Sequence, residues 1–282
     1  RSAKELGKGN YDAHFDATGY REIGELSETL KTAAQELRKT ETLRQDLVAN
    51  VSHDLRTPLT LITGYAEMIR DIPGETTREN MQVIIDEANR LSSLVGDLLD
   101  LSRLQSGTAE LHFERLCLTD EIRSIISRFQ KLSATEGTLV RLEAEGEVWV
   151  NADAARLSQV VYNFLINAMT HGGADKFILV RQTVSSGRVK VEVTDHGEGI
   201  APEDLPYIWD RYYKVDKTHK RTVVGAGLGL SIVKSILEQH PGVEYGAESA
   251  LAKGSTFWFS LPVADEDLEG STLQLPQGDN SP

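Results

Sequence analysis

Two successive helical stripes of apolar residues constrain the fold of this chain most strongly. In the first, apolar side chains recur every three or four positions, as one face of a helix requires: Val48, Val51, Leu55, Leu59, Ile62, Ala66 and Ile69. After a turn at residues 72–75, the spacing repeats: Met81, Ile84, Ala88, Leu91, Val95 and Leu98. Two such helices alone cannot bury both stripes well. The pattern therefore predicts a helical hairpin over residues 42–112 that dimerises into a four-helix bundle, or else packs on another domain.

Three further regions separate by pattern. Residues 1–41 hold a glycine-rich stretch and then a helical stripe that enters the hairpin without a breaker. Residues 113–263 alternate helix and strand patterns, which predicts a mixed α/β domain. Strands are expected at 138–143, 146–150, 176–183, 188–195, 242–248 and 255–261, and helices at 119–132, 153–170 and 228–239. Residues 264–282 are acidic and lack a stripe, so we expect a disordered tail.

Composition limits the partners and the chemistry. The 282 residues suffice for two or three domains, and the net charge of −13 disfavours binding to nucleic acid or anionic lipid. A phosphate ligand would need a local site of backbone N–H groups, a metal and a few cations. The single cysteine, Cys117, excludes an intramolecular disulfide framework and a multi-cysteine metal site. No apolar run approaches the roughly 20 residues that a membrane helix needs.

One histidine stands out by its place on the first helix. His53 lies in the segment Asn-Val-Ser-His-Asp-Leu-Arg-Thr-Pro-Leu, residues 50–59. At 100° per residue it lies about 200° from both Val51 and Leu55, so it should point away from the apolar stripe. Thr57, one turn later, should lie beside it on the solvent face.

The residue types around His53 suit phosphorus chemistry. A neutral imidazole nitrogen is a competent nucleophile toward phosphorus, and Asp54 can orient the ring or accept its proton. Pro58 removes one helical N–H and is expected to bend the helix one turn after the histidine. A lone histidine on a helix is usually an ordinary surface residue, so the prediction depends on the whole decapeptide.

The decapeptide closely resembles the H-box of histidine kinases of the HisKA type. The resemblance implies that His53 is phosphorylated from ATP and that Asp54 assists the transfer. It also implies that Thr57 positions water for dephosphorylation of a partner protein.

A second motif spans Arg156 to Ala168, where Asn163 and Asn167 lie four residues apart on one edge of a helical stripe. Amide oxygens suit Mg²⁺, although such a pair can also be hydrogen-bonded core amides. The segment resembles the family's N-box, which implies that Asn167 binds Mg²⁺ and that Asn163 contacts the phosphates. It departs from the family pattern after the second asparagine, where Thr170 and His171 replace a cation and an aromatic residue.

A third motif, Asp195-His-Gly-Glu-Gly, directly follows a predicted strand. A buried carboxylate at a strand end can accept a hydrogen bond from the adenine amino group. Gly197 and Gly199 allow the backbone to turn and to approach the ring closely. Alone, this pattern is a common turn. In this order it resembles the G1 box, which implies that Asp195 recognises adenine.

A fourth motif contains Gly225, Gly227 and Gly229 and opens a helix, whose N–H groups favour phosphate. The glycine spacing and the lack of an immediately preceding strand exclude a dinucleotide fingerprint, and the segment resembles the G2 box. Residues 208–214 resemble the F-box, with Trp209 where phenylalanine is usual. The cation-rich stretch up to residue 224 resembles an ATP lid, with Lys214 as the best candidate to reach the phosphates. Thr256, on the last strand, should help to close the adenine side.

The nucleotide motifs together resemble the Bergerat fold of histidine kinases, Hsp90, gyrase and MutL, which implies an α/β sandwich with a mixed sheet. The pattern Gly-x-x-x-x-Gly-Lys-Ser/Thr is absent, so no motif supports a P-loop. The segments 3–11 and 22–26 resemble the end of a HAMP relay, with Arg21 at a usually acidic position. This resemblance implies a cytoplasmic portion of a cell-membrane protein, attached through a preceding segment.

The resemblances imply one function and leave two alternatives. A homodimer would phosphorylate His53 from Mg²⁺-ATP, pass the phosphoryl group to an aspartate on the receiver domain of a response regulator, and dephosphorylate that regulator. An ATP-driven clamp of the Hsp90 or MutL kind would explain the nucleotide motifs but not the His53 segment. A signalling scaffold that binds ATP without transferring phosphate is the non-enzymatic alternative.

Overall fold

The computed structural model describes residues 21–105, 111–133, 137–211, 213 and 227–264. The HAMP-like residues 3–11 and nearly all of the expected tail lie outside these ranges. The chain divides into two compact units, residues 1–96 and 97–282. Within the described ranges, no helix is both long enough and apolar enough to cross a bilayer.

The first unit contains the predicted helical hairpin. Helix α2 runs from Arg21 to Asp71 and continues through Pro58, which is buried and does not end it. Helix α3 runs from Arg78 to Gln105, and its last turns belong to the second unit. Thr77 caps α3 because its hydroxyl accepts a hydrogen bond from the Asn80 N–H at 3.1 Å. The positive φ of Gly74, 94°, allows the preceding turn.

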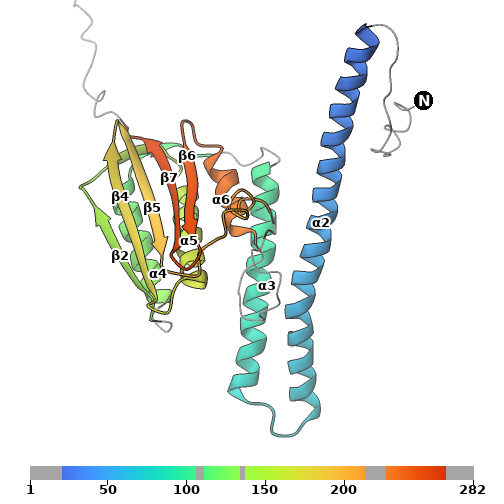
Figure 1. Cartoon of the computed structure of the whole chain (residues 1–282). Coiled ribbons are helices and arrows are strands. Elements are labelled where there is room, and N and C mark those ends of the chain that lie inside the picture. Colours follow the sequence, from blue (N-terminus) through green and yellow to red (C-terminus); the bar gives the residue numbers. More distant parts are fainter. Residues whose placement is uncertain (1–20, 106–110, 134–136, 212, 214–226, 265–282) are drawn as a thin grey trace, which may run out of the picture. The chain divides into compact units, whose positions relative to one another are not determined.

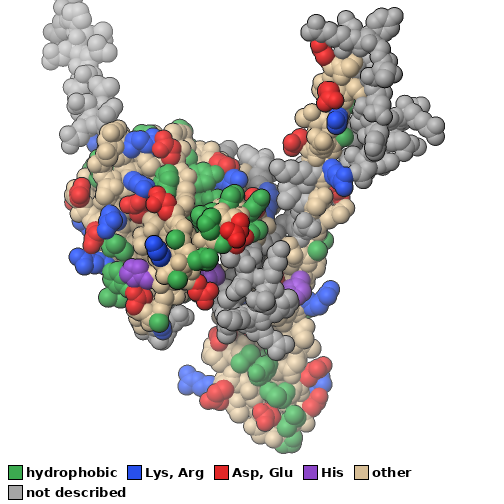
Figure 2. Space-filling view, in the orientation of Figure 1, with side chains coloured by type: hydrophobic (Ala, Val, Ile, Leu, Met, Phe, Trp, Pro, Cys, Tyr) green, Lys and Arg blue, Asp and Glu red, His purple; other side chains and the backbone are tan. Residues whose placement is uncertain are grey.

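Helix α3 carries an exposed apolar face. Met81, Ile85, Val95 and Leu99 are 43%, 51%, 43% and 55% exposed. At 100° per residue, all four point within about 40° of their common mean direction around the helix axis. Figure 2 shows hydrophobic side chains gathered near the turn of the hairpin, among acidic and basic ones. In the described structure of a single chain, this stripe of apolar side chains on α3 is therefore exposed and not covered by other apolar side chains.

The second unit is built on a five-stranded mixed sheet. Its strands are β2 (Leu139–Ala144), β4 (Phe177–Ser185), β5 (Arg188–Asp195), β6 (Glu244–Ala250) and β7 (Gly254–Pro262). The strand order is β2-β4-β5-β7-β6; β2 and β4 are parallel and the other neighbours are antiparallel. The expected sandwich with a mixed sheet is confirmed.

Three helices accompany the sheet: α4 (Leu118–Leu132), α5 (Ala154–His171) and α6 (Gly229–Leu237). Helices α4 and α5 cover one face of the sheet, and α6 packs beside α5 (Figure 1). Two short strands, β1 (Glu114–Cys117) and β3 (Trp149–Ala152), form a separate antiparallel pair. The sequence analysis missed β1, whose four residues are too few to show alternation, and placed β3 about three residues early.

The core lies between α5 and the sheet. Six apolar residues of α5 are at most 1% exposed: Leu157, Val160, Val161, Phe164, Leu165 and Ala168. They meet alternate residues of β5, where Val189, Val191 and Val193 are also at most 1% exposed. Burying one such side chain contributes about 1.5–3 kcal/mol, so the register of α5 on the sheet is strongly determined.

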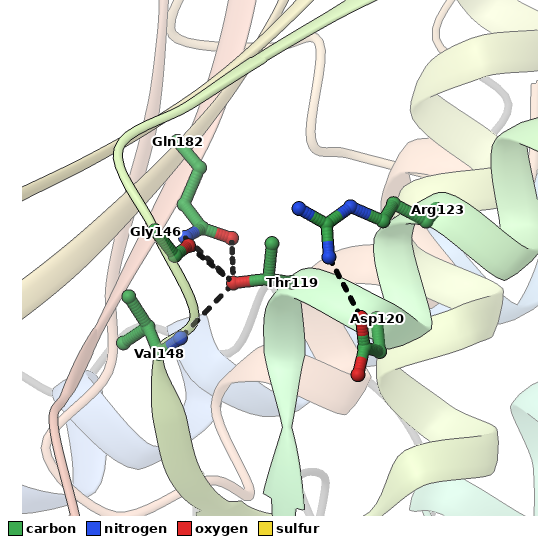
Figure 3. Close-up of polar contacts among 6 residues, drawn as sticks. All are labelled: Thr119, Asp120, Arg123, Gly146, Val148 and Gln182. Atoms are coloured by element: carbon green, nitrogen blue, oxygen red, sulfur yellow. Dashed lines mark hydrogen bonds and ion pairs between the residues drawn. The ribbon is translucent and has the colours of Figure 1, made fainter.

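A buried polar cluster ties the start of α4 to the sheet (Figure 3). Thr119 and Gln182 are 0% and 1% exposed. The Thr119 hydroxyl accepts hydrogen bonds from the Val148 N–H at 3.0 Å and from Gln182 Nε2 at 2.9 Å. It can donate its own proton to the carbonyl oxygen of Gly146, 3.1 Å away. Val148 and Gln182 are buried, so loss of this hydroxyl would leave the Val148 N–H and the Gln182 amide without this partner.

We predict that Thr119→Val lowers the free energy of unfolding by about 2 kcal/mol, because the methyl group keeps the shape and removes the hydrogen bonds. Urea unfolding followed by circular dichroism measures the change. Thr183→Val, at a half-buried position of the neighbouring strand β4, is the matched control and should change stability by less than about 0.5 kcal/mol. Equal effects of the two substitutions would contradict the role of the cluster.

Candidate functional site

His53 lies on α2, and its side chain is 71% exposed. This agrees with the prediction that it points away from the apolar stripe. Its Nδ1 is 3.3 Å from Asp54 Oδ1. The Thr57 hydroxyl donates to the His53 carbonyl oxygen at 3.4 Å. When Nδ1 carries the proton and donates it to the carboxylate, the lone pair is on Nε2. The arrangement can thus present a neutral, solvent-accessible nitrogen nucleophile.

Helix α5 places the two predicted asparagines on one edge. Asp153 caps the helix, because its Oδ1 accepts a hydrogen bond from the Arg156 N–H at 3.0 Å. Both Asn163 and Asn167 are half-buried. Asn163 Nδ2 donates to the Gln159 carbonyl oxygen at 3.0 Å. Its Oδ1 faces the start of α6, where a Cβ on Gly229 would lie 3.1 Å from it. The structure therefore brings Asn163 and Gly229 together.

Asp195 ends β5 and is 2% exposed. Its Oδ1 accepts hydrogen bonds from the Gly197 N–H at 2.8 Å and from the Ser255 N–H at 3.3 Å. Burial raises the pKa of this carboxyl group above its ordinary value, although the two N–H groups oppose the shift. Both donors use the same oxygen, so Oδ2 is available as an acceptor for a ligand.

The glycines after Asp195 are required by close backbone contacts. A Cβ on Gly197 would lie 1.8 Å from the His171 carbonyl oxygen at the end of α5. Gly199 has a φ of 73°, and a Cβ there would lie 2.0 Å from the Ala250 carbonyl oxygen. These contacts join the loop after β5 to the end of α5 and to the turn between β6 and β7.

Thr256 lies where the sequence placed it. It pairs with Thr194 across β5 and β7, and their hydroxyl oxygens are 2.9 Å apart. Thr194 directly precedes Asp195. Sequence reasoning missed Ser255, whose N–H reaches Asp195, and Gly254, where a Cβ would lie 2.0 Å from the Asp195 carbonyl oxygen. A glycine at the start of the last strand was the available signal for both residues.

Trp209, the departure from the F-box pattern, packs on the sheet. Its ring meets Tyr245 edge to face at a centroid distance of 5.1 Å and Phe257 at 6.1 Å. Phe257 in turn lies 5.7 Å from Phe164 of α5. The larger ring is therefore accommodated beside the core of the unit.

The residues of the predicted nucleotide motifs in the second unit gather around α5. One edge of the helix carries the asparagines, its end contacts the loop at Gly197, and the start of α6 faces Asn163. Gly227 is described and has a φ of 68°, whereas Lys214 and Gly225 lie outside the described residues. The described residues contain no cluster of three or more histidine, cysteine, aspartate or glutamate residues that could hold a metal ion. The amide oxygen of Asn167 could supply one ligand to a Mg²⁺ ion.

Comparisons with known families match both parts of the chain. Residues 43–107 match the His Kinase A (phospho-acceptor) domain. Residues 152–265 match the histidine kinase-, DNA gyrase B-, and HSP90-like ATPase family.

Two curated relatives are similar over most of this chain. The signal transduction histidine-protein kinase AfsQ2 of Streptomyces coelicolor is 32% identical over 291 residues, which cover 94% of this chain and 53% of that protein. The sensor protein kinase WalK of Staphylococcus saprophyticus is 34% identical over 232 residues, covering 80% of this chain and 38% of the relative. The chain thus spans about half or less of the length of these relatives.

Solved structures share the fold. Full-length ShkA in complex with AMPPNP is 26% identical, with a TM-score of 0.58, over 78% of this chain and 46% of that chain. ThkA in complex with the response regulator protein TrrA has a TM-score of 0.63 at 24% identity, over 80% of this chain and 64% of that chain.

We predict that Asp195→Asn makes the protein more stable at pH 7. Because the folded state raises the pKa, it binds this proton more tightly than the unfolded chain does. The free energy of unfolding of the parent therefore falls as pH rises from near 3.8, the ordinary value, through the raised pKa. The asparagine side chain keeps an oxygen that can accept hydrogen bonds from both N–H donors. It does not ionise, so the free energy of unfolding of the variant has no such pH-dependent fall. Thermal unfolding from pH 3.5 to pH 8 should show a stability difference that grows and then levels off. A variant that loses stability relative to the parent as pH rises would contradict this.

Proposed function

This chain belongs to the sensor histidine kinases, and we propose that it transfers the γ-phosphoryl group of ATP to His53 and then to an aspartate of a response regulator. The observation that carries the proposal is the exposed imidazole of His53 with Nδ1 held toward Asp54 at 3.3 Å. An ATP clamp or an ATP-binding scaffold has no need of this pair. The match to the phosphoacceptor family over the same residues supports the same choice.

The chemistry at His53 follows from the tautomer. With the Nδ1–H directed at Asp54, the Nε2 lone pair attacks the γ-phosphorus of ATP, and an N–P bond forms. The bond between that phosphorus and the bridging oxygen breaks, and its electron pair leaves with ADP. The Asp54 carboxylate stabilises the positive charge that develops on the ring and can accept the Nδ1 proton.

ATP binding is assigned to the second unit. Asp195 Oδ2 would accept a hydrogen bond from the adenine amino group, beside Gly197, Gly199 and Thr256. Asn163 Oδ1 and the backbone N–H groups at Gly227 and Gly229 would face the phosphates. The structure of a relative with AMPPNP, an ATP analogue, supports this assignment. Lys214 and Gly225, outside the described residues, remain part of the proposed phosphate site.

Mg²⁺ is assigned to the same helix. The amide oxygen of Asn167 would supply one ligand to the ion, one turn after Asn163 on the same edge of α5. When bound, Mg²⁺ neutralises charge on the phosphates. Asn167 holds the ion, and Asn163 orients the phosphate chain.

Thr57 is the proposed residue for dephosphorylating the regulator. It lies one turn after His53, and its side chain is exposed beside the same backbone carbonyl. Its hydroxyl could orient a water molecule toward an aspartyl phosphate on a docked partner. The co-crystallisation of a fold relative with a response regulator is consistent with such a partner.

Homodimerisation is proposed from the exposed face of α3. Met81, Ile85, Val95 and Leu99 share this face, and a second copy of the hairpin would cover them in a four-helix bundle.

We predict that the purified chain acquires acid-labile, base-stable label from γ-labelled ATP and Mg²⁺, and that His53→Gln abolishes it. Asp195→Asn should also prevent labelling, because the nucleotide is lost rather than the acceptor. His112→Gln is the control, since His112 is exposed and only its backbone N–H is used, at 2.9 Å from Asp153 Oδ2. Label that persists in His53→Gln, or a parent that never takes label, would overturn the proposal.

We also predict that Ile85→Asp converts the dimer to a monomer, because an aspartate would have to be desolvated in the bundle. Sedimentation equilibrium measures the change, which should exceed about a hundredfold in the dissociation constant, or roughly 3 kcal/mol. Ser93→Asp, at an exposed position about 120° round the helix from the centre of this apolar face, should leave the dimer intact. A monomeric parent at micromolar concentration would refute the assignment of this face.

A further inference from the structure

The last two turns of α3 are packed into the ATP-binding unit, which begins at Asp97. Leu101 and Leu104 are 3% and 5% exposed, whereas Leu99 of the same helix is 55% exposed. The Leu104 carbonyl oxygen accepts a hydrogen bond from Gln239 Nε2 at 3.4 Å, just beyond the end of α6. This end of α3 is therefore a structural part of the unit and more than a connection to it.

Asp100 joins this end of α3 to the first turns of α5. Its Oδ2 accepts a hydrogen bond from Gln159 Nε2 at 3.2 Å and lies 3.8 Å from Arg156 Nη1. Arg156 Nη1 also donates to Gln159 Oε1 at 3.0 Å. Each of the three side chains thus contacts the other two. The side chains of Asp100 and Arg156 are 35% and 22% exposed, so water screens the ion pair only in part.

The same glutamine leads to the proposed phosphate contact. The Gln159 carbonyl oxygen accepts the hydrogen bond from Asn163 Nδ2. Because the amide nitrogen is held there, Oδ1 is turned toward Gly229 at the start of α6. A shift of the second turn of α5 would therefore move this carbonyl together with the Asn163 side chain that it holds.

We propose that Asp100 is a positioning residue for the ATP site. It holds Gln159 and Arg156, and thereby the turn of α5 that orients Asn163 toward the phosphates. It does not touch the nucleotide and takes no part in the transfer. This inference rests on the proposed function, because it assumes that Asn163 contacts the phosphates.

Asp97 is a second carboxylate on this part of α3, in a different environment. It lies one turn before Asp100, and burial, followed by the charge of Asp100, raises its pKa above the ordinary value. Its environment therefore disfavours its charge, whereas Asp100 has Arg156 and Gln159 as partners. Asp97→Asn is accordingly a matched control for a change of charge on the same helix.

The test measures binding and catalysis separately in the whole chain. Displacement of a fluorescent ATP analogue by Mg²⁺-ATP gives the affinity, and labelling of His53 at several ATP concentrations gives KM and the maximal rate. Asp100→Ala should weaken ATP affinity and raise KM about tenfold, as loss of a supporting contact commonly does. The labelling rate at saturating ATP should stay within about twofold, because the reacting groups are unchanged.

Conservative and compensating variants separate positioning from general destabilisation. Asp100→Asn keeps an oxygen for Gln159 and should recover most of the affinity, and Asp97→Asn should match the parent. Asp100→Arg alone should bind ATP poorly, and adding Arg156→Asp should restore binding because the pair is rebuilt with its charges exchanged. This pair of variants also carries the test if Asp100→Ala does not fold.

The experiment distinguishes a failure of the proposed function from a failure of the positioning role of Asp100. A parent that neither binds ATP nor takes label would refute the proposed function itself. A parent that does both, with an unchanged KM in Asp100→Ala, would overturn only the positioning role. An equal loss of affinity in Asp97→Asn would overturn it as well, since the effect would then be one of charge on α3 and not of contact with α5.

Discussion

The burial of α5 against the sheet is the constraint on which the nucleotide site depends. Six apolar side chains of this helix are at most 1% exposed, and they meet the inward valines of β5. Turning the helix would expose several of them, at about 1.5–3 kcal/mol each. The register that the core imposes also sets the edge on which Asn163 and Asn167 lie. It likewise places the end of α5 against Gly197, so packing energy determines the geometry of the polar site.

The carboxyl group of Asp195 is a buried titratable group beside this core. Its pKa is raised because burial disfavours its charge, and two backbone N–H groups compensate only in part. The His53 and Asp54 pair is the opposite case, because the imidazole side chain is 71% exposed to solvent. In the proposed function, the buried carboxyl group would recognise a ligand, and the exposed imidazole would be open to both a phosphoryl donor and a phosphoryl acceptor.

Most of the fold could be predicted from periodicity, because burial on one face leaves a regular trace in the sequence. The two hairpin helices, the three helices of the second unit and the strands of the main sheet appear within a few residues of the expected bounds. The four-residue strand β1 was missed, since its pairing with β3 depends on a distant segment. Ser255 was missed because its contribution is a backbone N–H, which any residue type could supply. Asp100 gave no signal either, as acidic residues are common on exposed helices.

The sequence by itself determined the chemical groups of this protein and their order: a histidine beside an acid on a helix, then two asparagines, an aspartate between strand and glycines, and a glycine-rich helix start. Local spacing suffices for these, because a helix turn or a tight loop is short-range. Only the tertiary structure decided which groups meet. It brought Ser255 to Asp195, Gly229 to Asn163 and Asp100 to Gln159. These pairs are separated by about 60 residues in the sequence. The pairing of β5 with β7 brings the first into contact, and the packing of α5 with α6 and with the end of α3 brings the other two into contact.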